Sequence, residues 1–221
     1  MLKKIFVPFY IIAFLHLLSE CFYWDIVLWT KPLLMPALAM GLFWGVSISH
    51  RALHYIKLTV AALAFSTAGD VLLQLEKSLH QPLCFYFGLG AFLVAQWMYV
   101  LTFRNIGLLQ ISKKWGIAYL IYFLIFLFIL YPGMDLALKI PVTIYGLMLT
   151  WMAWNSWRVV TRGVFKYIAV IGSILFVASD SILAINKFKF DIPHAGIWIM
   201  LTYILAQYFI IEGVLLKTKS E

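Results

Sequence analysis

The sequence predicts an all-α polytopic membrane protein with eight transmembrane helices, and three observations support this fold class. Of the 221 residues, 64% are hydrophobic and only 12% are charged, whereas a soluble domain of this size would expose far more Lys and Glu. The few charges fall in short clusters between long apolar runs. Each run is about 16 to 24 residues long, enough for a helix to cross a hydrocarbon core of about 30 Å.

The eight predicted spans follow one another with no soluble domain between them. No connection is longer than about a dozen residues, so residues 1–221 are expected to form a single transmembrane domain. The spans are, in order, Ile5–Ser19, Pro32–Ser49, Tyr55–Leu75, Leu83–Phe103, Trp115–Tyr131, Leu136–Trp157, Phe165–Lys187 and Ala195–Leu216.

The first span resembles the start of a secretory signal peptide, because Lys3 and Lys4 precede a short apolar run. The run ends at Ser19, Glu20 and Cys21, with no small-residue cleavage site. We therefore expect the first span to stay in the protein as a transmembrane helix.

Positive charges are distributed unevenly between the two faces that these spans define. The face with both termini carries twelve Lys and Arg, and the other face carries five. By the positive-inside rule both termini are expected to be cytoplasmic, and the short loops favour a bacterial inner membrane. The net charge of +8 follows from this topology and does not indicate nucleic-acid binding. The twelve are Lys3, Lys4, Arg51, Lys57, Arg104, Lys113, Lys114, Arg158, Arg162, Lys166, Lys217 and Lys219, and the five are Lys31, Lys77, Lys139, Lys187 and Lys189.

Two aspartates, Asp70 and Asp180, lie inside the third and seventh spans. A carboxylate near the middle of a membrane helix costs about 2.5 to 3.5 kcal/mol to insert, so such residues usually line a cavity and have a function. Each Asp is about the sixteenth residue of its span, which places both in the non-cytoplasmic leaflet. Polar neighbours extend each Asp into a stripe that is expected to face the bundle interior. The alternative is that each Asp only joins helices through hydrogen bonds.

The two halves of the chain resemble each other at an offset of 110 or 111 residues. This offset aligns the two aspartates, and it also aligns Val94–Trp97 with Leu205–Tyr208. Four helices per half would insert in the same direction, so the sequence predicts two parallel four-helix repeats, residues 1–110 and 111–221. The alternative is chance similarity between apolar helices.

The stretches around the aspartates resemble the signatures of a known family. They are Phe65–Leu73 (FSTAGDVLL) and the more specific Ser179–Phe188 (SDSILAINKF). Both are similar to the signature stretches of the YhhN/TMEM86 family of lysoplasmalogenases. Further matches run in the family's order through nearly the whole chain, at Lys31–Leu33, Pro141, Val142, Tyr145, Tyr203 and Gln207.

This resemblance implies an eight-helix membrane enzyme without a cofactor. Its reaction would be hydrolysis of the vinyl ether bond of lysoplasmalogens to a fatty aldehyde and glycerophosphoethanolamine or glycerophosphocholine. Its partners would be this lysophospholipid substrate and the membrane lipids. The resemblance assigns catalysis to Asp70 and Asp180. The residues expected at the substrate are Lys31, Tyr145, Asn186, Lys187, Tyr203 and Gln207.

Vinyl ether hydrolysis needs a strong and well-placed acid, which a pair of carboxyl groups can supply. Protonation of the β-carbon gives an oxocarbenium ion, water attacks it, and the resulting hemiacetal collapses. One carboxylic acid that stays protonated near neutral pH can donate the proton, while its ionised partner stabilises the cation and accepts a proton from water. Glycoside hydrolysis divides the work between two carboxyl groups in a similar way. The sequence leaves open which Asp is the acid.

Cations on the non-cytoplasmic face are candidates for binding the phosphate of the head group. Lys31 and Lys187 fall inside the family-like stretches, so one or both are expected to hold it. The alternative is that they snorkel and anchor helix ends. Tyr145, Tyr203 and Gln207 are candidate hydrogen-bond donors in the cavity, although a membrane Tyr often lies at an interface.

The main alternative function is a transporter or proton-coupled carrier, because intramembrane Asp pairs also serve as proton or cation sites. Helices broken by Gly or Pro would favour it, but the third and seventh spans contain no Pro. A non-catalytic lipid-binding protein would need no paired acids. His50 and His54 are four residues apart but have no acidic residue nearby, so no metal site is predicted. Cys21 and Cys84 fall near one face and either pair or stay free.

Overall fold

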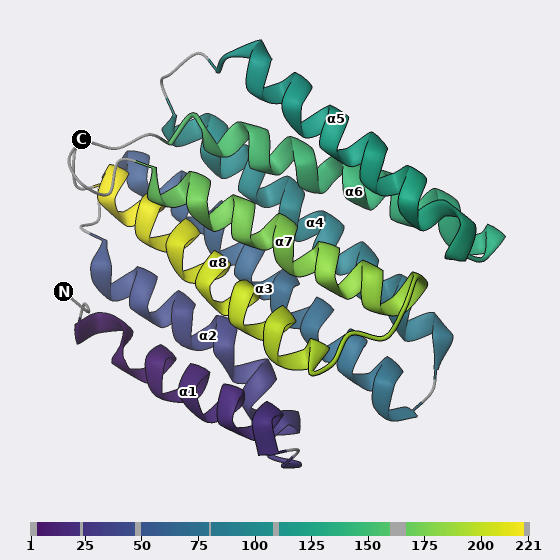
Figure 1. Ribbon diagram of the computed structural model, residues 1–221. Helices are drawn as coiled ribbons and strands as arrows, with labels where there is room; N and C mark the ends of the chain where they lie inside the picture. The colour runs from purple at the N-terminus through teal and green to yellow at the C-terminus, as the bar shows by residue number, and fades with distance from the viewer. Residues whose placement is uncertain are drawn as a thin grey trace.

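The computed structural model is a bundle of long helices lying alongside one another (Figure 1). It describes residues 4–22, 24–46, 50–79, 81–107, 111–159 and 167–218. Eight helices in this part of the chain are long and apolar enough to cross a membrane, which confirms the predicted fold class. They are α1 (Val7–Phe22), α2 (Val27–Gly45), α3 (His50–Leu79), α4 (Pro82–Ile106), α5 (Lys113–Leu130), α6 (Leu136–Ser156), α7 (Ile168–Phe188) and α8 (Ala195–Thr218), with 3-10 turns η1 (Lys4–Phe6) and η2 (Tyr131–Gly133).

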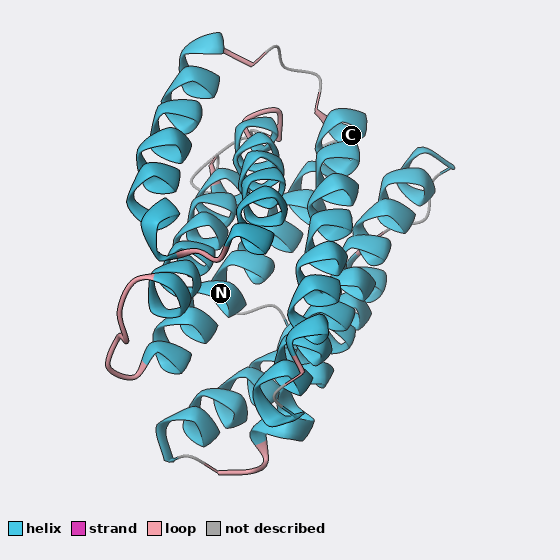
Figure 2. Cartoon of the chain, turned by 90° about the vertical axis from the view of Figure 1, so that its right-hand side faces the viewer, coloured by secondary structure: helices cyan, strands magenta, loops and turns pink. Residues whose placement is uncertain are grey.

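The helices alternate in direction, so the bundle has two distinct ends. We call the end where α1 begins and α8 ends the termini end, and the opposite end, where α3 and α7 end, the far end (Figure 1). The described chain consists of helices joined by loops, without a strand (Figure 2). This arrangement places the C-terminal halves of α3 and α7 at the same end of the bundle.

The bundle is built around two closely packed helix pairs, α3 with α4 and α7 with α8. Helix α6 packs on α4, and α2 packs on α3. Helices α1 and α5 lie at opposite edges of the bundle (Figure 1). Because α5 packs mainly on α6 and only slightly on α7, most of its large apolar side chains face outwards.

Glycines allow close helix contacts in both pairs. A Cβ added at Gly69 of α3 would lie 2.5 Å from a ring carbon of Phe92 on α4. A Cβ added at Gly172 of α7 would lie 2.8 Å from the Ala206 carbonyl oxygen on α8. Small residues are used in this way at membrane helix interfaces, where close backbone approach gives the packing energy. Phe92 and Asp70, the residue after Gly69, line the same cavity.

Helix α2 begins earlier than predicted, at Val27 instead of Pro32. The backbone N–H groups of Trp29 and Thr30 both donate to the Ile26 carbonyl oxygen at 3.0 Å, which starts the helix about one turn earlier. Lys31 therefore lies within α2 and not in the loop before it, which changes the direction in which its side chain can extend.

Helix α3 is longer than predicted at both ends, with bounds His50 and Leu79 in place of Tyr55 and Leu75. Polar and charged residues such as Lys77 continue the helix beyond the apolar run, because a helix keeps its backbone hydrogen bonds outside the hydrocarbon core. The predicted end of the second span at Ser49 and the predicted start of the seventh at Phe165 lie outside the described residues.

Candidate functional site

A mostly apolar cavity in the bundle contains both intramembrane aspartates. Counting the space where it opens, it encloses about 1020 Å³. Its wall is formed by side chains from α2 through α8. The polar groups that interrupt the apolar wall include Lys31, Asp70, Tyr145, Asp180 and Tyr203. The structure therefore brings five of the predicted site residues to one space.

Asp70 on α3 is held by two neighbours from distant parts of the chain. Its side chain is buried, with the residue 3% exposed. The hydroxyl of Tyr203 on α8 donates to Asp70 Oδ2 at 2.8 Å. The ammonium of Lys31 on α2 lies 3.8 Å from Asp70 Oδ1. A cation and a hydroxyl donor thus both face this carboxylate.

Asp180 on α7 has a different set of neighbours. The hydroxyl of Tyr145 on α6 donates to Asp180 Oδ2 in a short hydrogen bond. The next residue, Ser181, is hydrogen-bonded to the hydroxyl of Tyr122 on α5 at 2.6 Å. Within the described residues, no Lys, Arg or His forms an ion pair with Asp180. In this part of the chain, Asp180 is thus held by the phenol hydroxyl of Tyr145 and not by a cation.

The two carboxyl groups lie at matching depths in the bundle. Asp70 is nine residues from the end of α3 and Asp180 is eight residues from the end of α7. These separations place both about 12 to 14 Å from the far end, at a rise of about 1.5 Å per residue. The predicted count of sixteen residues from each helix start is wrong, because α3 begins at His50 and α7 at Ile168. Both groups line the same cavity.

Gln207 lies one turn from Tyr203 on α8 and is fully buried behind the cavity wall. Its Nε2 donates to Ser66 Oγ on α3 at 3.2 Å, and the hydroxyl of Tyr99 on α4 donates to its Oε1. The amide thus joins α8 to α3 and α4 beneath Tyr203. It is absent from the lining of the cavity as the structure describes it.

Asn186 and Lys187 lie near the end of α7 and are not among the residues that line the described cavity. The side-chain oxygen of Asn186 accepts a hydrogen bond from the backbone N–H of Ile192 at 2.8 Å, which shapes the turn after the helix. Lys187 Nζ lies 3.0 Å from Glu76 Oε1 on α3 and 4.4 Å from the centre of the Phe85 ring on α4. Both residues therefore contact the protein itself, and their substrate-binding roles stay predictions.

Helix α5 forms a wall of the site that sequence reasoning did not find. Tyr122, Phe123, Phe126, Leu127 and Leu130 line the cavity from this helix. They recur at intervals of three or four residues, which is the spacing of one helix face. This periodicity was the available signal, but aromatic residues are frequent all along the fifth span, so the face did not stand out.

Other predicted groups lie apart from this cavity. Cys21 and Cys84 are free thiols in the structure. In the part of the chain that the structure describes, no three side chains of His, Cys, Asp or Glu gather as metal ligands would. His50 is within α3, but its side chain is outside the described set.

The fold and the site together define a multi-pass α-helical membrane protein with two intramembrane carboxyl groups, one buried and one partly buried, at one apolar cavity. The chain belongs to the YhhN family, whose family model matches residues 26–214.

Curated relatives cover most of the chain. Lysoplasmalogenase TMEM86B of Rattus norvegicus is 33% identical over 186 residues, which cover 81% of this chain and 70% of the relative. Lysoplasmalogenase TMEM86B of Homo sapiens is 32% identical over 212 residues, or 88% of this chain and 82% of the relative. The Mus musculus protein of the same name is 32% identical over 194 residues, or 85% and 76%. No solved structure gives a significant match.

Proposed function

We propose that this membrane enzyme hydrolyses the vinyl ether bond of lysoplasmalogens, with Asp180 as the general acid and Asp70 as the ionised partner. The observation that carries the proposal is that two carboxyl groups, the buried Asp70 and the partly buried Asp180, line one apolar cavity. Similarity to lysoplasmalogenases over most of the chain supports the substrate class. A single-chain lipid suits a cavity with mostly apolar walls and a few polar groups.

The reaction proceeds through proton transfer to carbon. The acid protonates the β-carbon of the vinyl ether, and the positive charge that develops is shared between the α-carbon and the ether oxygen. The ionised carboxylate stabilises this cation and takes a proton from the water that adds to the α-carbon. The hemiacetal then breaks its bond to the glycerol oxygen, giving the aldehyde and the glycerophospho head group. In this collapse Asp70 returns the proton taken from water to the glycerol oxygen, and Asp180 takes the proton of the hemiacetal hydroxyl, which restores the starting state of the pair.

The neighbours of each carboxyl group support this division of roles. Lys31 and the Tyr203 hydroxyl both stabilise a negative charge on Asp70. Asp180 accepts from the Tyr145 hydroxyl at Oδ2, so a proton on its Oδ1 leaves that hydrogen bond intact. Two like charges at one apolar site repel, which favours a pair that shares a single proton. Asp180 is therefore assigned as the acid.

The transporter alternative is not favoured, because the curated relatives found for this chain are named lysoplasmalogenases. The two Asp-bearing helices, α3 and α7, also run without an internal Pro.

The test follows aldehyde release from a lyso vinyl ether lipid by purified protein in detergent. A saturated alkyl ether of the same head group is the substrate control. We expect release from the parent and a loss of about 100-fold or more in Asp70→Asn and Asp180→Asn, the scale of general acid–base catalysis. Asp191→Asn, at an exposed position near the far end, is the matched control and should keep parent activity.

Proton transfer to carbon has its own signature in heavy water. The aldehyde formed in D₂O, reduced at once to the alcohol, should carry one deuterium on the carbon next to the former carbonyl. Aldehyde without this label would contradict the acid step. No aldehyde from the parent with either an ethanolamine or a choline head group would overturn the proposed function.

A further inference from the structure

An apolar groove continues from the cavity toward the termini end of the bundle. It lies between α5 and α7 and holds about 770 Å³, counting the space where it opens. Tyr122 and Val177 line both the groove and the cavity, so the two spaces meet at these residues. The junction is next to Asp180, because Tyr122 is hydrogen-bonded to Ser181. The groove is thus an apolar extension of the space that contains the carboxyl groups.

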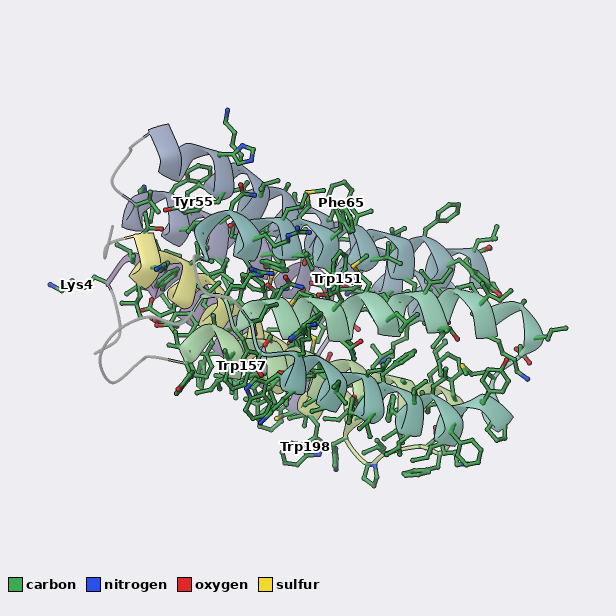
Figure 3. The ribbon with its side chains drawn as sticks, turned by 90° about the horizontal axis from the view of Figure 1, so that it is seen from above. Lys4, Tyr55, Phe65, Trp151, Trp157 and Trp198 are labelled. Carbon is green, nitrogen blue, oxygen red and sulfur yellow. The ribbon has the colours of Figure 1, made fainter. Side chains whose placement is uncertain are left out.

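A pair of stacked indoles closes the groove on the side nearer the termini end. The rings of Trp115 on α5 and Trp157, just after α6, are 4.4 Å apart and tilted by 12°. Both line the groove, and Trp157 lies toward the end of the bundle that carries Lys4 (Figure 3). Between the junction and this pair the lining includes the small side chain of Ala118 on α5. From Tyr122 to Trp115 the helix advances about 10 Å.

We propose that this groove holds the hydrocarbon chain of the substrate and that the Trp115–Trp157 pair limits the chain length accepted. The inference rests on the proposed function and adds to it the place where the hydrocarbon chain of the substrate binds. A vinyl ether joins a polar glycerophospho group to an apolar chain. With the double bond at Asp180, the polar half faces the part of the cavity that contains Lys31 and Asp70. The hydrocarbon chain needs an apolar path in another direction, and the groove begins beside Asp180, where Tyr122 and Val177 line both spaces.

Selection by length would come from steric exclusion. A chain that moves from a detergent micelle into the groove exchanges one apolar surrounding for another, so the transfer itself gives little discrimination. A chain longer than the groove must displace the stacked indoles or bend outward. A side chain that fills the groove should therefore shorten the accepted length, and removal of an indole should extend it.

The experiment compares kcat/KM for a series of lyso vinyl ether lipids with chains from 8 to 20 carbons. Ala118→Phe fills the groove, and Ile117→Phe is the matched control because Ile117 is exposed on the outer side of α5 at the same depth. We expect Ala118→Phe to reduce kcat/KM for the longest chains by about tenfold or more, the scale of steric overpacking, with the shortest chains unaffected. Ile117→Phe should keep the parent profile.

Trp115→Ala tests the same inference in the opposite direction. It should raise kcat/KM for the longest chains relative to the medium ones, a gain that misfolding does not produce. Parent-like length profiles in both Ala118→Phe and Trp115→Ala would overturn the inference while leaving the proposed function intact. A change of oligomeric state in Ala118→Phe without a change of length profile would also overturn it, by assigning the groove to a second copy of the chain. Absence of aldehyde from the parent at every length would instead refute the proposed function.

Discussion

At the scale of single residues, the two aspartates differ mainly in what faces them. Asp70 has a cation and a hydroxyl donor, whereas Asp180 has a hydroxyl donor from Tyr145. Lys31 is therefore the residue that makes the pair unequal. Its side chain is 17% exposed, so water screens its charge less than it would at an open surface. This position favours the role of keeping Asp70 ionised over the role of snorkelling to a helix end.

Removal of the Lys31 charge tests this interpretation. Lys31→Met keeps the apolar stem but leaves Asp70 buried without a cation, which favours its protonated form. We expect kcat to fall about 10- to 100-fold at neutral pH, since a hydrogen bond or ion pair to a charged group is worth about 1.5 to 3 kcal/mol. Activity should recover as pH is raised, because Asp70 then ionises, and Lys31→Arg should retain more activity than Lys31→Met.

Kinetic parameters separate this role from phosphate binding. The control is Lys77→Met, which removes an exposed lysine near the same end and should leave the pH–rate profile unchanged. A rise in KM with unchanged kcat in Lys31→Met would contradict the electrostatic role. That result would support the predicted contact between Lys31 and the head-group phosphate instead.

At the scale of helices, the sequence predicted the elements that carry a strong local signal. A carboxylate in an apolar helix is costly, so Asp70 and Asp180 could be identified and their matching depth inferred without coordinates. Their tyrosine partners were expected as cavity donors, but the pairing of Tyr203 with Asp70 and of Tyr145 with Asp180 depends on which helices touch. The residue spacing along one helix carries no information on that choice.

Lys187 shows the same limit more clearly. Its place in a family-like stretch suggested a phosphate ligand, yet in the structure its ammonium contacts Glu76 on α3 and the Phe85 ring on α4. The α5 wall was missed for a related reason: its aromatic face becomes visible only when α5 is known to lie against α6 and α7. The partner of a side chain and the helix face that lines the site therefore depend on contacts between helices, which the pattern along one helix does not show.

The Lys187–Glu76 pair gives a prediction at this scale. It joins the far ends of α7 and α3, next to the two Asp-bearing segments. Both side chains are partly exposed, at 32% and 27%, so we expect a coupling energy of only about 0.2 to 1 kcal/mol in a double-mutant cycle of Lys187→Met and Glu76→Gln. Thermal unfolding in detergent measures the coupling.

Enzyme kinetics on the same variants tests the site assignment. Lys187→Met should lower kcat far less than Lys31→Met, because Lys187 lies outside the described cavity lining. Glu76→Gln is the matched control, since it breaks the pair without removing the cation. If Lys187→Met raises KM about tenfold or more while Glu76→Gln does not, Lys187 binds the phosphate as the resemblance predicted, and its pairing with Glu76 does not account for its role.

At the scale of the whole molecule, the alternating helices give the site a fixed relation to the two ends of the bundle. Both carboxyl groups are nearer the far end, and the groove extends from them toward the termini end. A lysolipid bound in this way places its head group toward the far end and its hydrocarbon chain toward the termini end. The side of the membrane at the far end therefore decides which leaflet supplies the substrate.

The charge distribution predicts that the far end is non-cytoplasmic, since it carries five of the seventeen Lys and Arg. The test uses a background with Cys21 and Cys84 replaced by Ala, and single cysteines at Lys189→Cys on the far end or Lys113→Cys on the termini end. A membrane-impermeant maleimide added to intact bacterial cells should label Lys189→Cys, and should label Lys113→Cys only after lysis. The reverse pattern would place the termini outside and the substrate head group in the cytoplasmic leaflet. Labelling of both positions in intact cells would indicate a dual topology, in which the positive-inside bias is too weak to orient the chain.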